Sequence, residues 1–332
     1  MTLLKRLVTP LAFTILSSSA IAAPTNAEVE ALKAEFITSQ TANGFDAAEI
    51  TQFIDNAEYN QAVIDAMTKP WEAKPWHQYY PIFLTDKRLE KGLAFWNEHA
   101  DTIAKAAKEF NVDPQIIVAI IGIETYYGGY MGNYPVKDAL YTLGFYYPPR
   151  AKFFRSEFAN LQSLVKEEQL DINSLKGSYA GAMGFGQFIP SSYRHYAVDF
   201  DNDGKRDLLN SKADAIGSVA NYFHQHGWQK DQPVTLQLTL NKDLPDNLKV
   251  WAGERLHYKV ADILSPEISL AKSIDLDVSQ PAMLVKLEQA DHDEYWLGLK
   301  NFYVITRYNR SPLYAMAVYQ FSQELKQAYV TQ

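Results

Sequence analysis

Glu124 is the residue whose type and surroundings most directly indicate chemistry. It is the only acid in the otherwise almost entirely apolar segment IIGIETYYG, residues 120–128. The Asp-Pro pair at 113–114 is typical of a helix start and Gly128-Gly129 of a helix end. The pattern therefore predicts a buried helix over residues 115–123, with Glu124 in its last turn.

Two effects act on this carboxyl in the same direction. Burial disfavours the charged carboxylate, and the negative end of the helix dipole disfavours it further, so both raise the pKa of Glu124. A carboxyl that stays protonated near neutral pH can serve as a general acid. The alternative is that Glu124 points outward and pairs with a surface lysine. This segment alone leaves both readings open.

A second segment, GSYAGAMGFGQF at residues 177–188, concentrates small residues around two polar side chains, Ser178 and Gln187. Glycines let a backbone approach a ligand closely, and these two side chains have the groups to hydrogen-bond an acetamido group or the acid itself. The alternative is a tight corner between packed helices. The spacing differs from the Gly-x-Ser-x-Gly elbow of serine hydrolases, so a serine nucleophile is disfavoured.

An acidic loop begins with Asp199, Asp201 and Asp203, followed by Gly204. These residues occupy positions one, three, five and six of an EF-hand loop, and Lys205 would offer its backbone carbonyl at position seven. The spacing favours a structural calcium ion over an acidic surface turn. Calcium is a hard, redox-inert cation, so we expect it to brace the loop rather than to take part in chemistry.

The end of this loop departs from the EF-hand pattern. Position twelve holds Asn210 instead of a bidentate glutamate. Asp214 follows four residues later and has the carboxylate to serve as the last ligand from the next helix. Alternatively, Asp214 forms a capping box with Ser211.

Two further groups of polar residues are candidate sites. Tyr308 and Asn309, with Tyr314 beyond them, are expected between a strand and a helix, where they form a groove wall or are simply buried. His224 and His226 are two residues apart on a predicted helix and point to different faces, so a metal site there is disfavoured.

The elements that must position these residues are mainly helical. Helical spacing of apolar residues runs from about 26 to 106, interrupted by a proline-rich aromatic loop at 69–81, and resumes to Trp228. Alternating segments at 234–240, 284–287 and 303–306 predict strands of a small antiparallel unit. A last helix is predicted over residues 315–325. The fold class is therefore α+β, mainly α.

Composition and the chain start restrict the protein class. Residues 1–22 combine Lys5 and Arg6, a short apolar stretch and small residues, which is the layout of a cleavable secretory signal rather than of a membrane anchor. The chain has no cysteine, so neither a disulfide framework nor a lipid-modified cysteine is expected. A net charge of −8 with scattered lysines and arginines argues against nucleic acid as a partner. The 21 tyrosines suit flat polar ligands such as sugars.

Four motifs in order, GIETYYG (122–128), GSYAGAMGFGQFIPSSY (177–193), DAIGSVANYF (214–223) and RYNRS (307–311), resemble the lytic murein transglycosylase B family. The likeness runs from about residue 76 to residue 319. It implies a lysozyme-like core with a flanking helical domain, a small antiparallel β domain and a glycan groove between them. The implied limits are 1–22 signal peptide, 23–100 with 311–332 helical domain, 101–230 core with the calcium loop 199–214, and 231–310 β domain.

The resemblance also implies site residues. Glu124 would protonate the glycosidic oxygen between N-acetylmuramic acid and N-acetylglucosamine, then take the proton of the muramoyl 6-hydroxyl as a 1,6-anhydro ring closes. The implied substrate contacts are Tyr79, Ser178, Met183, Gln187, Phe188, Tyr222, Tyr308, Asn309 and Tyr314. The implied calcium ligands are Asp199, Asp201, Asp203, Lys205 and Asp214, the last displaced by one inserted residue. No organic cofactor is expected.

Two other functions are compatible with the same residues. A hydrolytic muramidase would leave reducing ends, and an inactive glycan-binding envelope protein would bind without turnover. Ordinary glycosidases use two carboxylates, whereas this sequence offers one obvious buried acid, which favours an intramolecular hydroxyl as nucleophile. We expect a monomer in the periplasm that acts on peptidoglycan glycan strands and, lacking cysteine, is not a lipoprotein. The sequence identifies no protein partner.

Overall fold

The computed structural model describes residues 23–68, 74–253 and 255–331. Helices dominate, and a small antiparallel sheet lies at one end of the molecule, so the predicted α+β, mainly α fold class is confirmed. The predicted signal segment, 1–22, lies outside the described residues, as does the 69–73 part of the predicted aromatic loop. The domain limits given above stay a prediction.

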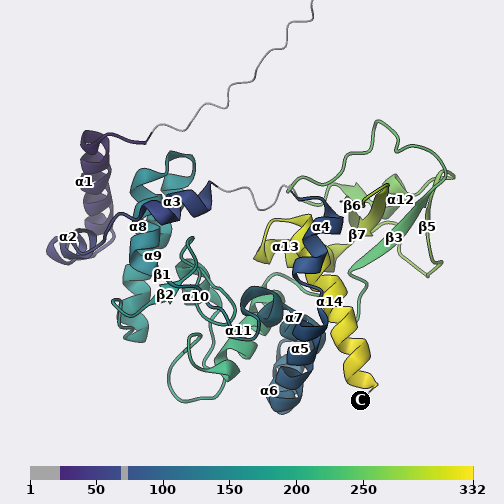
Figure 1. Cartoon of the computed structure of the whole chain (residues 1–332), viewed down its shortest axis with the longest axis horizontal. Helices are drawn as coiled ribbons and strands as arrows, with labels where there is room; N and C mark the ends of the chain where they lie inside the picture. The colour runs from purple at the N-terminus through teal and green to yellow at the C-terminus, as the bar shows by residue number, and fades with distance from the viewer. Residues whose placement is uncertain (1–22, 69–73, 254, 332) are drawn as a thin grey trace, which may run out of the picture.

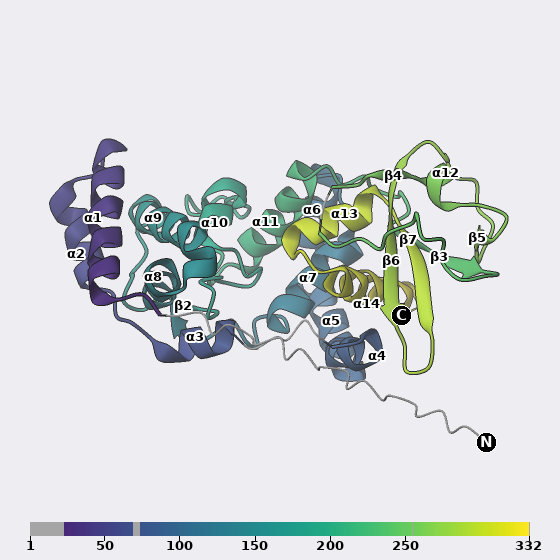
Figure 2. The same cartoon turned by 90° about the horizontal axis from the view of Figure 1, so that it is seen from above.

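One group of helices lies at the end of the molecule opposite the sheet (Figures 1 and 2). Here α1 and α3 pack against α8, and α8 and α10 pack against α9. Helix α1 begins with a capping box, in which Thr25 Oγ1 accepts from the Glu28 N–H at 3.3 Å and the Glu28 carboxylate accepts from the Thr25 N–H at 2.7 Å. The elements of this group are α1 (Asn26–Ala42), α2 (Ala47–Asp55), α3 (Gln61–Met67), α8 (Val136–Tyr146), the 3₁₀ turn η3 (Pro148–Arg150), α9 (Ala151–Glu168) and α10 (Pro190–Tyr196).

A second group of helices surrounds α7, which spans Pro114–Thr125. Every residue from Gln115 to Ile123 is buried, as the apolar sequence predicts. The neighbours that cover it are α5 (Asp86–Glu98), α6 (Ala100–Glu109), α11 (Lys212–Gln225) and α14 (Pro312–Val330). Helix α14 comes from the C-terminal end of the chain, so α7 is enclosed by segments that lie far apart in sequence (Figure 1).

The sheet has five strands in the order β4-β6-β7-β3-β5, and all neighbours are antiparallel. Its register pairs Leu284 with Leu297, and these leucines are buried in a small core separate from the main helical core. The strands are β3 (Thr235–Leu240), β4 (Tyr258–Lys259), β5 (Ile268–Leu270), β6 (Pro281–Glu288) and β7 (Asp293–Gly298), with the short helix α12 (Val260–Ile263) between β4 and β5. The strands predicted at 234–240 and 284–287 are confirmed.

A two-stranded ladder supports the glycine-rich segment. Strand β1 (Tyr134–Pro135) pairs antiparallel with β2 (Lys176–Gly177), and Tyr134 lies opposite Gly177. Space at this crossing is tight, because a Cβ added to Gly132 would lie 2.1 Å from the carbonyl of Gly177. The ladder therefore fixes the start of the segment that carries Ser178.

Two of the secondary-structure predictions are wrong. The predicted strand at 303–306 is part of helix α13 (Lys300–Tyr308), which packs against α14. The described part of the predicted aromatic loop contains the short helix α4 (Trp76–Tyr79) and a 3₁₀ turn, η2 (Tyr80–Ile82). Pro75 is the N-cap of α4, so the proline starts a helical turn here instead of excluding one.

None of the helices within the described residues has the length and apolarity that a membrane span needs.

Candidate active site

The catalytic candidate lies at the end of a helix that stops abruptly. Helix α7 ends because Tyr126 and Tyr127 both adopt left-handed backbone angles, with φ of 53° and 58°. The prediction that Gly128-Gly129 ends the helix was therefore wrong by two residues. Such angles are unfavourable for tyrosine, and packing compensates, because the Tyr127 ring is buried against Phe95 with 5.1 Å between ring centroids.

The other end of α7 is fixed by a side chain that does not cap it. Asp113 occupies the N-cap position, but its carboxylate accepts hydrogen bonds from Trp228 Nε1 at 2.8 Å and from the Asp231 N–H at 3.3 Å. The start of α7 is thus tied to the chain that leaves α11.

Glu124 is paired with a phenol from the far end of the chain. The Tyr314 hydroxyl donates to Glu124 Oε1 at 2.5 Å. Desolvation raises the pKa of the Glu124 carboxyl to about 7, against the opposing effect of this hydrogen bond. Burial and the negative charge of Glu124 hold the pKa of Tyr314 well above its ordinary value, so the phenol is a neutral donor. The raised pKa of Glu124 agrees with the sequence prediction.

No acid within the described part of the chain has a resolved effect on the pKa of Glu124. Only burial and the Tyr314 hydrogen bond perturb its pKa, so no carboxylate among the described residues exerts a resolved charge effect on it. Retaining and inverting glycosidases need two carboxyl groups within about 10 Å of each other. The pKa of Glu124 thus shows no influence of a second carboxyl group of the kind that these enzymes use.

Aromatic side chains from two helices pack beside Glu124. Tyr308, at the end of α13, donates to the Gly186 carbonyl at 2.5 Å, and Tyr222 of α11 donates to the Arg307 carbonyl at 2.5 Å. The Tyr222 and Tyr308 rings contact each other at 4.7 Å between centroids, and the Phe188 ring packs against both, 5.9 Å from Tyr308 and 5.7 Å from Tyr222. Both tyrosine hydroxyls are used in holding backbone, which makes this surface rigid.

The segment after Gly181 forms a tight loop. Met183 and Phe188 pair as an antiparallel bridge, with backbone N···O distances of 2.9 and 3.0 Å. Gln187 adopts a left-handed backbone angle of 50°, and its side-chain nitrogen donates to the carbonyls of Gly184 at 3.0 Å and Met131 at 3.2 Å. This strained, cross-braced turn fixes the orientation of Gln187.

Ser178 directly follows strand β2, and Asn309 directly follows helix α13. The Ser178 hydroxyl accepts from the Ala180 and Ala182 N–H groups at 3.3 and 3.0 Å, so its proton is left over for another acceptor. Asn309 follows α13, and its backbone carbonyl accepts from the Ser311 N–H at 2.8 Å. Among the described residues, neither side chain forms a hydrogen bond with Glu124.

Tyr79 is the last residue of α4. Its ring lies 5.1 Å from that of Phe83, and its charge acts on the pKa of Tyr314, so it is close to the Glu124–Tyr314 pair. Glu124 likewise acts on the pKa of Tyr222 and Tyr308. The structure thus brings Glu124 together with four of the nine expected substrate contacts.

Sequence reasoning did not select Thr125, which follows Glu124 directly. This side chain is buried, and its hydroxyl bonds to backbone outside the helix. A signal was present, because a hydroxyl in the last turn of a helix that is apolar on all faces must find a partner.

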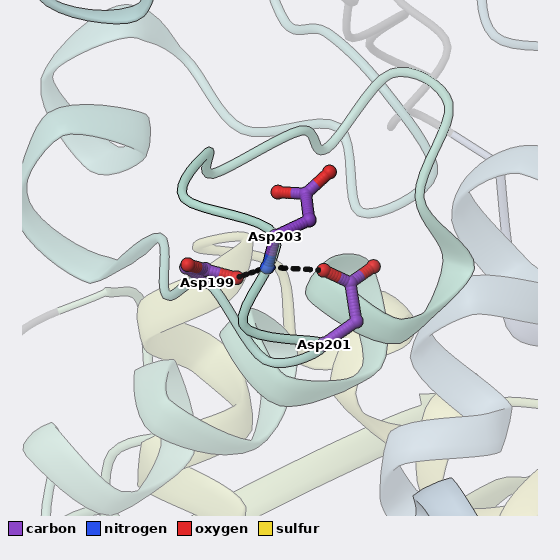
Figure 3. A group of neighbouring side chains, drawn as sticks. All are labelled: Asp199, Asp201 and Asp203. Atoms are coloured by element: carbon purple, nitrogen blue, oxygen red, sulfur yellow. Dashed lines mark hydrogen bonds between the residues drawn. The ribbon is translucent and has the colours of Figure 1, made fainter.

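The acidic loop forms the second candidate site. Asp199, Asp201 and Asp203 each bring a carboxylate oxygen within 4.8 Å of the others. Figure 3 shows the Asp203 N–H directed at Asp199 and Asp201, with N···O distances of 3.1 and 3.2 Å. Such a group of oxygen donors suits a hard cation such as calcium.

Asn210 at position twelve of the loop and Asp214, the expected last ligand, both have other partners. Asn210 donates from its side-chain nitrogen to the Asp207 carboxylate at 3.0 Å. Asp214 is fully buried, and its two oxygens accept from the N–H groups of Phe200 and Asp207, both at 2.7 Å. The Ser211 hydroxyl accepts from the Asp214 N–H, which is half of the alternative capping box. Asp214 lies outside the group of three aspartates.

Comparison with known proteins matches residues 28–323 to the transglycosylase SLT domain family. The chain is 40% identical over 299 residues to the membrane-bound lytic murein transglycosylase B of Escherichia coli, covering 87% of this chain and 80% of that protein. The crystal structure of the soluble lytic transglycosylase SltB1 from Pseudomonas aeruginosa has a TM-score of 0.81 and 44% identity, covering 89% of this chain and 98% of that one.

A third relative bears on the acidic loop. The Escherichia coli lytic transglycosylase Slt35, solved in complex with calcium, has a TM-score of 0.80 and 39% identity, covering 90% of this chain and 94% of that one. The family match spans most of the sequence, and it includes both the helix that carries Glu124 and the acidic loop. This chain therefore belongs to the family of lytic murein transglycosylases with the transglycosylase SLT domain.

Proposed function

We propose that this lytic murein transglycosylase cleaves the β-1,4 bond between N-acetylmuramic acid and N-acetylglucosamine in peptidoglycan with Glu124 as its only acid and base. The observation that carries the proposal is the state of this carboxyl. Its pKa is raised to about 7 by burial, and a neutral phenol at 2.5 Å holds one of its oxygens. A large fraction of Glu124 is therefore protonated at neutral pH, as a general acid requires.

The reaction needs two proton transfers at one carboxyl group. In the first, protonated Glu124 gives its proton to the glycosidic oxygen as the bond from that oxygen to C1 of N-acetylmuramic acid breaks. In the second, the Glu124 carboxylate takes the proton of the muramoyl 6-hydroxyl while O6 bonds to C1. The products are a 1,6-anhydromuramoyl end and a free 4-hydroxyl, no water is consumed, and Glu124 is protonated again. An intramolecular nucleophile replaces the second carboxylate of ordinary glycosidases.

Tyr314 has two effects on this cycle. Its hydroxyl fixes the orientation of the Glu124 carboxyl, and it stabilises the carboxylate that exists between the two proton transfers. Without it, burial alone would leave Glu124 a weaker acid. The remaining residues expected to hold the glycan are Tyr79, Ser178, Met183, Gln187, Phe188, Tyr222, Tyr308 and Asn309. Hydrolysis by a muramidase of the same fold is not favoured by the family match.

We also propose that the acidic loop binds a structural calcium ion. Asp199, Asp201 and Asp203 would supply side-chain oxygens, and Lys205 would supply its backbone carbonyl. In support, the loop has the right donor type and spacing, and the N–H groups of Asp203 and Gly204 already orient the Asp199 carboxylate at 3.1 and 2.9 Å. Each carboxylate oxygen of Asp214 already accepts one backbone hydrogen bond. To serve as the last ligand, one of these oxygens would have to accept that hydrogen bond and bind the ion at the same time.

We propose that the protein works in the periplasm after removal of residues 1–22. The substrate supports this location, because peptidoglycan lies outside the cytoplasmic membrane. N-terminal sequencing of protein recovered from a periplasmic fraction checks the cleavage site, for which we expect Ala23 as the first residue.

Mass spectrometry of the soluble products tests the proposed reaction. Purified peptidoglycan is incubated with the enzyme and with Glu124→Gln. We expect products one water lighter than reducing muropeptides, formed by the enzyme and absent with the variant. Reducing products would mean hydrolysis, and equal turnover by the variant would remove Glu124 from the mechanism.

A further inference from the structure

Thr125 joins the helix of Glu124 to the loop of Gln187 and Phe188. It is the last residue of α7 and only 1% exposed. Its hydroxyl oxygen lies 3.0 Å from the Phe185 carbonyl oxygen and accepts from the Gly128 N–H at 3.0 Å. One side chain therefore bonds to the turn that follows the helix and to the loop that carries Gln187 and Phe188.

The hydroxyl has one proton and two carbonyls within reach. The Ile121 carbonyl, 3.1 Å away, also accepts from the Tyr127 N–H at 3.3 Å. For the Phe185 carbonyl, Thr125 is the only hydrogen-bond donor among the described residues. Because a buried carbonyl without a donor is costly, the proton belongs on the bond to Phe185.

A second contact fixes the same two segments together. A Cβ added to Gly128 would lie 2.3 Å from Cε1 of Phe185, so this ring packs directly on the turn after α7. The next carbonyl of the loop, that of Gly186, accepts from the Tyr308 hydroxyl. The loop is thus held at two consecutive carbonyls. Thr125 at the end of α7 bonds to the carbonyl of Phe185, and Tyr308 of α13 bonds to the carbonyl of Gly186.

We propose that Thr125 is a positioning residue, whose hydroxyl sets the distance between the Glu124 carboxyl and the sugar held by the Gln187–Phe188 loop. The inference rests on the proposed role of Glu124 as acid and base. Proton transfer needs donor and acceptor within hydrogen-bond reach, and a misplacement of about 1 Å can reduce the rate by about 10²-fold. Thr125 touches no reacting atom, and it acts through the relative placement of the two segments.

Two matched pairs of variants test the proposal. Thr125→Val keeps the side-chain volume and removes the hydroxyl, while Thr125→Ser keeps the hydroxyl and removes a methyl. Thr125→Ala differs from Thr125→Ser only by that hydroxyl. Each is assayed for kcat and KM on a soluble glycan tetramer of alternating N-acetylglucosamine and N-acetylmuramic acid, and for its thermal midpoint. We expect kcat of Thr125→Val to fall about tenfold or more with KM within about twofold, and Thr125→Ser to keep kcat within about threefold.

A packing role gives a different order. If Thr125 only fills space, Thr125→Ser loses stability and activity while Thr125→Val keeps both, and this result overturns the proposal. Should Thr125→Val fail to fold, the kcat ratio of Thr125→Ser to Thr125→Ala decides, with a ratio near one contradicting the hydroxyl's role. Glu124→Gln is measured in parallel, because turnover by that variant would show a failure of the proposed acid and not of Thr125.

Discussion

The molecule holds carboxyl groups in two opposite ways. Glu124 stands alone at the end of a buried helix, next to a neutral phenol, and burial raises its pKa. Asp199, Asp201 and Asp203 gather in a largely exposed loop, within 4.8 Å of one another and faced by backbone N–H groups. The same functional group is thus isolated from charge in one region and concentrated with like charge in the other.

The difference shows how environment selects chemistry. A desolvated carboxyl avoids its charge and becomes an acid that can give a proton, whereas exposed carboxylates keep their charge and attract a cation. Helix packing creates the first environment, and loop geometry creates the second. The proposed proton transfer and the proposed ion binding are therefore independent, and variants can change one without the other.

The largest effect is expected from Glu124→Gln. The amide keeps the shape but can neither give nor take the proton, so we expect turnover of peptidoglycan to fall by at least about 10³-fold. Glu109→Gln is the matched control, because Glu109 also ends a helix but is exposed and should leave turnover unchanged. Comparable losses in both variants would mean that burial does not distinguish the two glutamates.

The next largest effect is expected from Tyr314→Phe. Loss of the hydroxyl removes the donor that opposes the pKa rise of Glu124, so the carboxyl becomes a weaker acid. A hydrogen bond to a charged group is worth about 1.5–3 kcal/mol, which predicts a loss of about tenfold to a hundredfold in kcat. The pH at which activity falls on the alkaline side should move upward.

Tyr319→Phe provides the control for this change. Tyr319 lies on the same helix and is partly buried, but its hydroxyl has no described contact with Glu124. We expect its kcat and pH profile to match those of the wild type. A kcat for Tyr314→Phe within twofold of the wild type would contradict the role given to this phenol.

Part of this comparison could be predicted from the sequence alone. The almost entirely apolar run 115–123 predicts a buried helix, and an acid at the end of a buried helix is expected to be desolvated. The direction of the pKa shift of Glu124 could therefore be predicted. Its partner could not be predicted, because Tyr314 lies 190 residues away along the chain. Three aspartates at fixed spacing predict a loop that gathers carboxylates because all three are local in sequence.

Helix α13 shows where local pattern fails. The β-branched residues Val304, Ile305 and Thr306 favour a strand locally, yet they form one buried stretch of a helix packed on α14. The helix cost of such residues is below about 1 kcal/mol each, so burial and packing outweigh it. Asn301 anchors the start of this helix by donating to the Gln229 carbonyl at 2.7 Å, a contact that no local pattern reveals.

A smaller effect is expected from removing calcium. An ion that binds only the folded state stabilises it by RT ln(1 + [Ca²⁺]/Kd), about 3 kcal/mol at a hundredfold excess over Kd. We expect a chelator to lower the thermal midpoint of the wild type by several degrees. Asp201→Asn should abolish this shift, and Asp243→Asn, which changes an exposed acid elsewhere, should keep it. An unchanged wild-type midpoint would contradict the proposed ion.

The smallest expected effect is the dependence of folding stability on pH that the desolvated carboxyl of Glu124 causes. The ordinary pKa of a glutamate is 4.5, and that of folded Glu124 is about 7. Between these values the unfolded chain has already lost a proton that the folded protein keeps. Stability from this group is therefore complete below about pH 4.5 and is lost as pH rises through about 7.

Glu124→Gln removes this dependence, so it should become more stable than the wild type at pH 8 but not at pH 5. The expected gain is about 1–2 kcal/mol, because the Glu124 residue as a whole is only half-buried although its carboxyl is desolvated, and solvent screening reduces the effect. This gain corresponds to a few degrees in the thermal midpoint. Thermal scans of both proteins at the two pH values, in excess calcium, measure it while the acidic loop stays unchanged. An equal difference at both pH values would mean that the carboxyl is not desolvated in the folded enzyme, and the contrast with the exposed aspartates would no longer hold.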